Sequence, residues 1–237
     1  MLLLSGERFL VNREPPLSAA EESVMTCVAL IGGTGQEGQG LARRFALAGL
    51  SVRLGSRNRQ RGQEAAQVLA VSSVVGGDYV EALDGADFAV LCVPYTAHAA
   101  VLNAIKPLLG GRLIIDITVP LKPPKVRQVF LPDGQAAALE AQALLGDQGR
   151  VVAALHHISH TQLADADQPV AGDVLVCGAK ADREEALPLI ASLGLSVLDA
   201  GPLRNAIALE AMTPVLLHLN RRYGGHASLA IQGLSTA

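Results

Sequence analysis

Short runs of apolar residues alternate along this chain with longer segments in which apolar residues recur at helical spacing. The short runs predict buried strands, and the longer segments predict helices that cover them. Because strands and helices alternate with short connections, the sequence predicts an α/β fold with a doubly wound parallel sheet. Besides the apolar run that begins at Val28, we expect strands at 52–54, 71–75, 87–94, 113–117, 151–155, 174–177 and 196–198, and helices at 37–48, 65–69, 79–83, 97–109, 136–145, 183–193 and 203–219.

The first apolar run breaks into glycines with the spacing G-x-G-x-x-G, at Gly33, Gly35 and Gly38. A strand followed by this spacing and a helix is the pattern of a dinucleotide-binding turn. Such glycines allow a tight turn, let the backbone approach a pyrophosphate, and let the helix pack closely on the strand. The helix N-terminus would add free N–H groups, so we expect an anion site here. Taken alone, the pattern is also compatible with an ordinary glycine-rich turn.

About twenty residues further on, dinucleotide-binding folds of the NAD type place an acidic residue that binds the ribose. This chain has no carboxylate there; it reads GSRNRQR and offers the hydroxyl group of Ser56 and the guanidinium groups of Arg57, Arg59 and Arg61. Arginine donors suit phosphate oxygens, so the cluster predicts binding of the 2′-phosphate of NADP(H). The alternative is a basic, solvated helix start that binds nothing.

The composition narrows the class of protein. Hydrophobic residues make up 50% of the chain and aromatic residues only 3%, which suits parallel strands buried on both faces by Ala, Val, Leu and Ile. A net charge of −3 gives no basic field for nucleic acid, and the apolar stretches are too short or too interrupted to span a membrane. Cys27, Cys92 and Cys177 form no C-x-x-C pair and are expected to be buried thiols, so we expect a cytoplasmic protein.

Three histidines, His156, His157 and His160, follow the strand expected at 151–155. Imidazoles at this spacing can bind zinc, but no fourth ligand is evident, and no metal is predicted. We expect His156 to line the pocket and its titration near neutral pH to modulate binding. The sequence contains neither a G-x-S-x-G elbow nor a Walker A loop, which argues against a hydrolase or a P-loop NTPase.

Several motifs, taken together and in order, resemble those of one known family. They are GGTGQEG, GSRNRQR, LHHIS, VCG, and LDAGPL followed by TPVLLHLN. The combination runs from about Met25 to Ile231 and resembles the NADPH-dependent coenzyme F420 reductases, also called F420:NADP oxidoreductases. The resemblance implies a Rossmann domain with a small C-terminal lobe, reversible hydride transfer between NADP(H) and the 5-deazaflavin coenzyme F420, and a homo-oligomer such as a homodimer.

The same resemblance implies roles for individual positions. No catalytic side chain is expected, because the two coenzymes carry the reactivity. For Ile158 and Leu217, plain core packing remains an equal alternative. Arg61 stands where the family often has lysine, Glu37 at a place that is often apolar, and Ser159-His160 in place of a Pro-Ala pair. The implied sites are the pyrophosphate site at Gly33, Thr34, Gly35, Gln36 and Glu37; the 2′-phosphate site at Ser56, Arg57 and Arg61; the nicotinamide site at Val93, Val119 and Leu229; and the deazaflavin pocket at His156, Ile158, Thr213 and Leu217.

We divide the chain into an N-terminal extension at 1–24, an NADP-binding domain at 25–155, and a C-terminal lobe for substrate binding and oligomerisation at 156–237. The extension is expected to be either a poorly ordered segment or a mis-assigned start, and to be dispensable for cofactor binding. Two other functions remain open. An NADPH-dependent reductase of another acceptor, such as a flavin, a ferric chelate or a small imine or carbonyl compound, would need the same nucleotide site. So would a non-catalytic NADP(H) redox sensor.

Overall fold

The structure is a computed structural model that describes residues 25–165 and 168–234, and the expected extension at 1–24 lies outside the described residues. Its centre is an eight-stranded sheet in the order β3-β2-β1-β4-β5-β6-β7-β8. The first six strands in this order each run parallel to their neighbours among the six. This order confirms the predicted α/β fold with a doubly wound, mostly parallel sheet. The strands are β1 (Cys27–Ile31), β2 (Ser51–Ser56), β3 (Val74–Asp78), β4 (Phe88–Leu91), β5 (Leu113–Asp116), β6 (Arg150–Ala153), β7 (Asp173–Gly178) and β8 (Ser196–Asp199).

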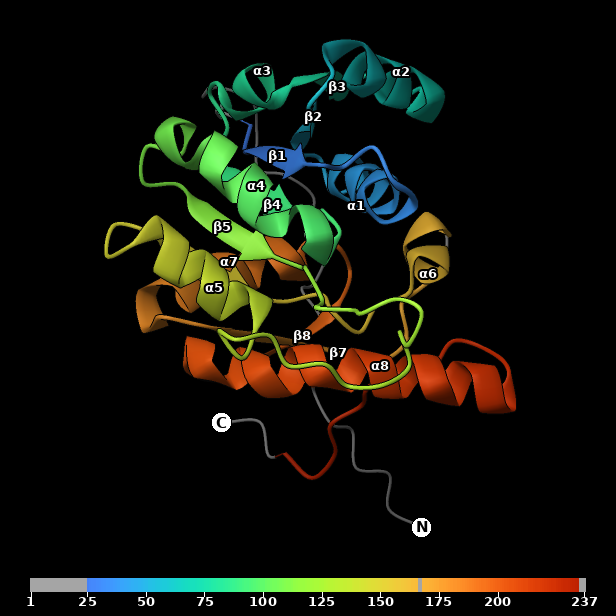
Figure 1. Cartoon of the computed structure of the whole chain (residues 1–237). Helices are drawn as coiled ribbons and strands as arrows, with labels where there is room; N and C mark the ends of the chain where they lie inside the picture. Colours follow the sequence, from blue (N-terminus) through green and yellow to red (C-terminus); the bar gives the residue numbers. More distant parts are fainter. Residues whose placement is uncertain (1–24, 166–167, 235–237) are drawn as a thin grey trace.

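Helices cover both faces of the sheet (Figure 1). One face carries α1 (Gln36–Leu47), α2 (Arg59–Leu69) and α7 (Lys180–Ala191), with the short α6 (His160–Ala164) beside α1. The other face carries α3 (Tyr79–Leu83), α4 (Tyr95–Ile105), α5 (Ala137–Leu145) and α8 (Ala206–Tyr223). Two short 3-10 turns, Lys106–Leu108 and Leu203–Asn205, precede β5 and α8.

The strands are buried on both faces, as their nearly continuous apolar sequences predict. In β1, Val28 and Leu30 pack toward α1 and α2, whereas Ala29 and Ile31 pack toward α3 and α4. All four side chains are almost fully buried. Burial of this kind explains why the strand sequences lack the apolar–polar alternation of a sheet that faces water on one side.

Three elements differ most from the sequence-based expectation. No helix was expected where α6 lies. β3 runs from Val74 to Asp78 instead of 71–75, and its second half was missed because Gly76 and Gly77, which pair with β2, carry no strand signal. β7 runs antiparallel to β6, although a parallel sheet was expected throughout. Two neighbouring strands can run parallel only if the connection crosses back to the edge at which the first strand began. The connection after β6 contains only the short α6 and stays at the carboxyl edge. β7 therefore begins at that edge and runs in the opposite direction.

β7 and β8 continue the same sheet, and Figure 1 shows α8 passing beneath them. The second half of α8, with Thr213 and Leu217, reaches the carboxyl edge of the sheet. The division into two domains stays a prediction. Because the carboxyl ends of parallel strands form the usual binding crevice of a doubly wound sheet, α8 is placed to close that crevice from one side.

Candidate functional site

In the glycine-rich turn after β1, the start of α1 packs closely against the turn, and the turn faces the crevice. A Cβ atom at Gly38 would lie 2.4 Å from the Cα atom of Gly33, so only glycine lets α1 start this close to the turn. The residue with positive φ is Gly32 (φ +77°), one position before the predicted motif. Gly35 caps α1 without any side-chain hydrogen bond, and an added Cβ there would meet nothing within 4 Å. The first N–H groups of α1 are thus available to an anion.

The arginine cluster after β2 is divided by the structure. Arg57 and Arg61 are exposed and line the cavity at the carboxyl edge, next to the buried Ser56. Arg59 instead forms an ion pair with Glu81 at 2.6 Å and is not among the lining residues. Two of the three predicted guanidinium groups therefore remain available for a phosphate.

A cavity of about 850 Å³ runs along the carboxyl edge of the sheet, from the arginine cluster to α8. Its size is typical of a ligand site. It brings together most of the residues named from the sequence, although they come from segments far apart in the chain. Those that line it are Thr34, Gly35, Gln36, Glu37, Ser56, Arg57, Arg61, Val93, Val119, His156, Ile158, Thr213 and Leu217.

Gly33 and Leu229 do not line this cavity. Gly33 is buried beneath the turn, where an added Cβ would lie 2.7 Å from the Cβ of Leu30. The carbonyl oxygen of Leu229 accepts a hydrogen bond from the N–H of Asp173 at 2.7 Å, which holds Leu229 at the start of β7. The expected place of Leu229 beside the nicotinamide stays a prediction.

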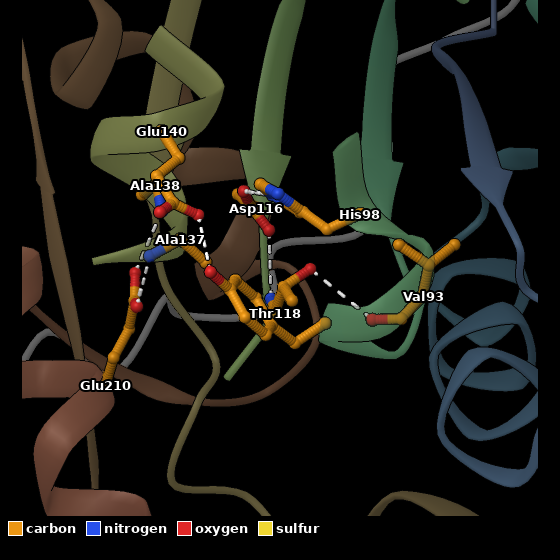
Figure 2. Close-up of polar contacts among 9 residues, drawn as sticks. Val93, His98, Asp116, Thr118, Ala137, Ala138, Glu140 and Glu210 are labelled. Atoms are coloured by element: carbon orange, nitrogen blue, oxygen red, sulfur yellow. Dashed lines mark hydrogen bonds and ion pairs between the residues drawn. The ribbon is translucent and has the colours of Figure 1, made fainter. Parts of the chain in front are cut away.

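Buried polar contacts fix the apolar wall that Val93 and Val119 form (Figure 2). The Nε2 atom of His98 in α4 lies 2.7 Å from the Oδ2 atom of Asp116 at the end of β5, and both side chains are almost fully buried. The second carboxylate oxygen of Asp116 accepts the N–H of Thr118 at 2.9 Å, and the Thr118 hydroxyl group donates to the carbonyl oxygen of Val93 at 3.5 Å. Asp116 thus ties together the chain segments that carry both valines.

A second buried carboxylate holds α5 against α8, also visible in Figure 2. The two oxygens of Glu210 accept the N–H groups of Ala137 and Ala138 at 2.6 and 3.0 Å. Burial raises the pKa of Glu210 to about 8, and the two N–H groups oppose that shift. On the same helix α5, Glu140 accepts a hydrogen bond from the hydroxyl group of Tyr95 at 2.8 Å.

The segment after β6 is tied to α8 by two hydrogen bonds. The Thr213 hydroxyl group donates to the carbonyl oxygen of His156 at 3.0 Å, and a ring nitrogen of His157 lies 2.7 Å from the carbonyl oxygen of Leu209. The residue before them, Leu155, has φ +66°, a conformation that non-glycine residues rarely adopt. The backbone therefore turns sharply where the sheet ends and directs this segment into the cavity.

His156 is 6% exposed and lines the cavity, yet neither ring nitrogen has a hydrogen-bond partner among the described residues. A buried polar group without a partner is costly, so an absent ligand is the simplest partner for it. Burial, assisted by the neighbouring His157, lowers the pKa of His156 to about 3. The expected titration near neutral pH is therefore wrong, and His156 stays a neutral donor and acceptor.

Arg44 joins α1 to the segment around α6. The side chain is buried, and its nitrogen atoms donate to the carbonyl oxygens of Leu163, Gln162, Asp165 and Gln168 at 2.7 to 3.2 Å. Hydrogen bonds from a charged donor are stronger than neutral ones. The helix that carries the glycine-rich turn is thus fastened to the segment that follows the histidines.

Some lining residues escaped the sequence analysis. Tyr79, Ala97 and Leu121 carry no motif, and only the folded chain brings them to the cavity. Gly32 had a readable signal, since a glycine directly after a strand often marks the turn itself. Within residues 25–165 and 168–234, no group of three His, Cys, Asp or Glu side chains could hold a metal ion, and no helix is long and apolar enough to cross a membrane.

A glycine-rich turn, an arginine pair and an apolar wall at the carboxyl edge of a doubly wound sheet are the features of a dinucleotide-binding protein of the Rossmann class. Known proteins narrow this class. Residues 27–120 match the family described as "NADP oxidoreductase coenzyme F420-dependent". The F420-dependent NADP reductase of Methanothermobacter marburgensis is 40% identical over 81% of this chain and 92% of its own length.

Two further comparisons agree. The F420-dependent NADP reductase of Methanocaldococcus jannaschii is 33% identical over 83% of this chain and 93% of its own length. A crystal structure of a protein from Arthrobacter sp. FB24 superposes with a TM-score of 0.73 at 23% identity, covering 89% of this chain and 99% of that one, and shows the shared fold. The chain belongs to the family of F420-dependent NADP reductases.

Proposed function

We propose that the cavity at the carboxyl edge binds both reactants of hydride transfer between NADP(H) and coenzyme F420 at the same time, with no catalytic side chain between them. The observation that carries this proposal is the continuity of one cavity from Arg57 and Arg61 to the unpartnered His156. A dinucleotide held at the first end and a flat acceptor at the second would meet over the ends of β4 and β5.

We assign the dinucleotide to the end formed by the turn after β1. The free N–H groups at the start of α1 would bind the pyrophosphate, with Thr34, Gly35 and Gln36 around it. Arg57, Arg61 and the hydroxyl group of Ser56 would hold the 2′-phosphate. The backbone N–H of Asn58 already contacts the Ser56 oxygen, so this hydroxyl hydrogen is free to point outward.

Val93 and Val119 would support the nicotinamide, and His156, Ile158, Thr213 and Leu217 would surround the deazaflavin. Bound together, the two coenzymes would supply the hydride donor and the hydride acceptor, and reduction of F420 would consume one proton from solvent. The protein's part is to align the rings and to exclude water with apolar walls. The neutral His156 can offer one hydrogen-bond donor and one acceptor to polar groups on the acceptor.

We also propose that the protein is a homodimer that uses α8. Met212, Val215, Leu219 and Tyr223 recur at helical spacing on α8 and are 36%, 40%, 37% and 78% exposed. A row of exposed apolar side chains on one helix is typical of an interaction surface. A cytoplasmic location remains part of the proposal, supported by three cysteines that form no disulfide.

An assay with several acceptors tests the reaction. Purified protein with NADPH should remove the visible absorbance of coenzyme F420, and with reduced F420 it should convert NADP⁺. A flavin, a ferric chelate and a cyclic imine serve as competing acceptors under the same conditions. Faster turnover of one of these would assign the chain to another reductase activity. Saturable NADPH binding without turnover of any acceptor would identify a sensor.

A further inference from the structure

Among the described residues that line the cavity, Glu37 is the one acidic residue. It is the second residue of α1 and is partly buried. None of the described residues donates a hydrogen bond to its carboxyl group. A carboxyl group beside a dinucleotide site needs an explanation, because the phosphates of the dinucleotide would repel a carboxylate.

The structure indicates which part of the dinucleotide Glu37 would face. The turn after β1 lies between the end of β2, with its arginines, and the end of β4. Besides burial, the charge of Glu37 raises the pKa of Cys92, which directly follows β4 and precedes Val93. The turn itself contacts the end of β4, because a Cβ atom added to Gly32 would lie 2.4 Å from the Cγ1 atom of Val93, and Val93 lines the cavity together with Glu37. In a doubly wound sheet the dinucleotide crosses this switch point, so its nicotinamide half lies on the β4 side.

The two redox forms of the cofactor differ in charge at that half, because the ring of NADP⁺ is a cation and the ring of NADPH is neutral. We infer that Glu37 sets the preference of this site between the two forms: its carboxylate favours NADP⁺, and its protonated form releases that preference. The inference rests on the proposed placement of the cofactor. Glu37 changes only the equilibrium between bound forms, since a protein cannot shift the equilibrium of the free reactants.

The preference should depend on pH near neutrality. Burial raises the pKa of Glu37 to about 7, so its carboxyl group is mostly ionised above this pH and mostly protonated below it. Around the start of α1, burial keeps the thiol of Cys92 and the ring of His156 neutral. Asp116 is held by His98 and Thr118. The other charged or titratable residues that line the cavity are Arg57, Arg61, Tyr79, His157, His160 and His226.

The test is the ratio of two affinities. The dissociation constants of NADPH and NADP⁺ are measured at pH 6 and pH 8 for the unmodified protein, Glu37→Gln and Glu184→Gln. The control removes an exposed carboxylate of α7 that does not line the cavity. Both nucleotides carry the same phosphates, so titration of the phosphates cancels in the ratio.

Between pH 6 and pH 8 the ratio should move about ten-fold toward NADP⁺ in the unmodified protein and in the control, the size expected for a partly screened charge at close range. In Glu37→Gln it should not move. A ratio that is constant in the unmodified protein, or that still moves in Glu37→Gln, overturns the inference and, in the second case, assigns the pH dependence to another group of the cavity. Failure to bind either nucleotide would instead overturn the proposed function.

Calorimetry gives a second measurement that needs no variant. Titrations in two buffers of different ionisation enthalpy report the protons taken up on binding. At pH 7, NADPH should bind with greater proton uptake than NADP⁺, because only the cationic ring stabilises the Glu37 carboxylate. Equal proton uptake for the two nucleotides would contradict the inference.

Discussion

The two ends of the cavity are built in different ways. The nucleotide end comes from one stretch of chain, in which glycines bring α1 close to β1 and two arginines follow β2. The rest of the cavity, from the wall formed by Val93 and Val119 to the proposed acceptor end, comes from segments far apart in the chain, which Asp116, Thr213 and Glu210 join through hydrogen bonds. Close backbone packing at glycines stabilises the nucleotide end, and hydrogen bonds of polar side chains stabilise the rest of the cavity. Substitutions should therefore damage the two ends by different physical routes.

The largest effect is expected at Asp116. Asp116→Ala leaves the ring of His98 and the N–H of Thr118 without their partner in a buried place. The free energy of unfolding should fall by about 3–5 kcal/mol, as measured by urea denaturation. Glu185→Ala, which breaks an exposed ion pair with Arg150, is the control and should change it by less than about 1 kcal/mol. Equal losses of unfolding free energy in the two variants would show that the buried contacts of Asp116 contribute no more to stability than the exposed ion pair.

Substitutions at two glycines distinguish a loss of packing within the protein from a loss of ligand binding. Gly38→Ala places a Cβ atom 2.4 Å from the Cα atom of Gly33 and should destabilise the protein by about 1–3 kcal/mol. Gly35→Ala meets no protein atom within 4 Å, and its φ of −81° suits alanine. It should keep the melting temperature and lose NADPH affinity. An unchanged affinity in Gly35→Ala would place the pyrophosphate elsewhere.

The arginine pair is tested by nucleotide choice. Arg57→Ala should weaken NADPH binding roughly ten-fold, because one charged hydrogen bond to the 2′-phosphate is lost, and should spare NADH. Arg59→Ala is the matched control, since Arg59 already pairs with Glu81. Fluorescence titration with both nucleotides gives the comparison. Equal losses for NADPH and NADH in Arg57→Ala would remove the proposed phosphate contact.

The smallest effect is expected at the acceptor end. Thr213→Val keeps the shape of the side chain and removes the hydroxyl group that holds the carbonyl oxygen of His156. A loss of about 1 kcal/mol should raise the KM for coenzyme F420 several-fold. The KM for NADPH in the same variant is the internal control and should not change. A rise in both constants would mean that the two ends are not separate.

The same contrast explains what could be predicted from the sequence. The apolar runs, the glycine-rich turn and the paired arginines are local patterns, and the structure brings nearly all of the named residues to one cavity. The direction of β7 depends on where its connection runs, which no local pattern shows. His98, Asp116 and Glu210 are single polar residues within apolar segments, so only the folded contacts reveal them.

The expected titration of His156 shows what a local pattern leaves out. It assumed an accessible ring, whereas the ring is buried beside His157. Burial depends on contacts between distant segments, so the sequence could not reveal it. Leu229 hydrogen-bonds to β7 through its backbone and does not line the cavity, and its role stays a prediction.

Arg44 couples α1 to the segment around α6. Its side chain donates four hydrogen bonds to carbonyl groups of that segment, so the two elements are fixed to each other at several points. We expect a displacement of α1 to shift this segment together with it, because moving them apart would break several charged hydrogen bonds at once.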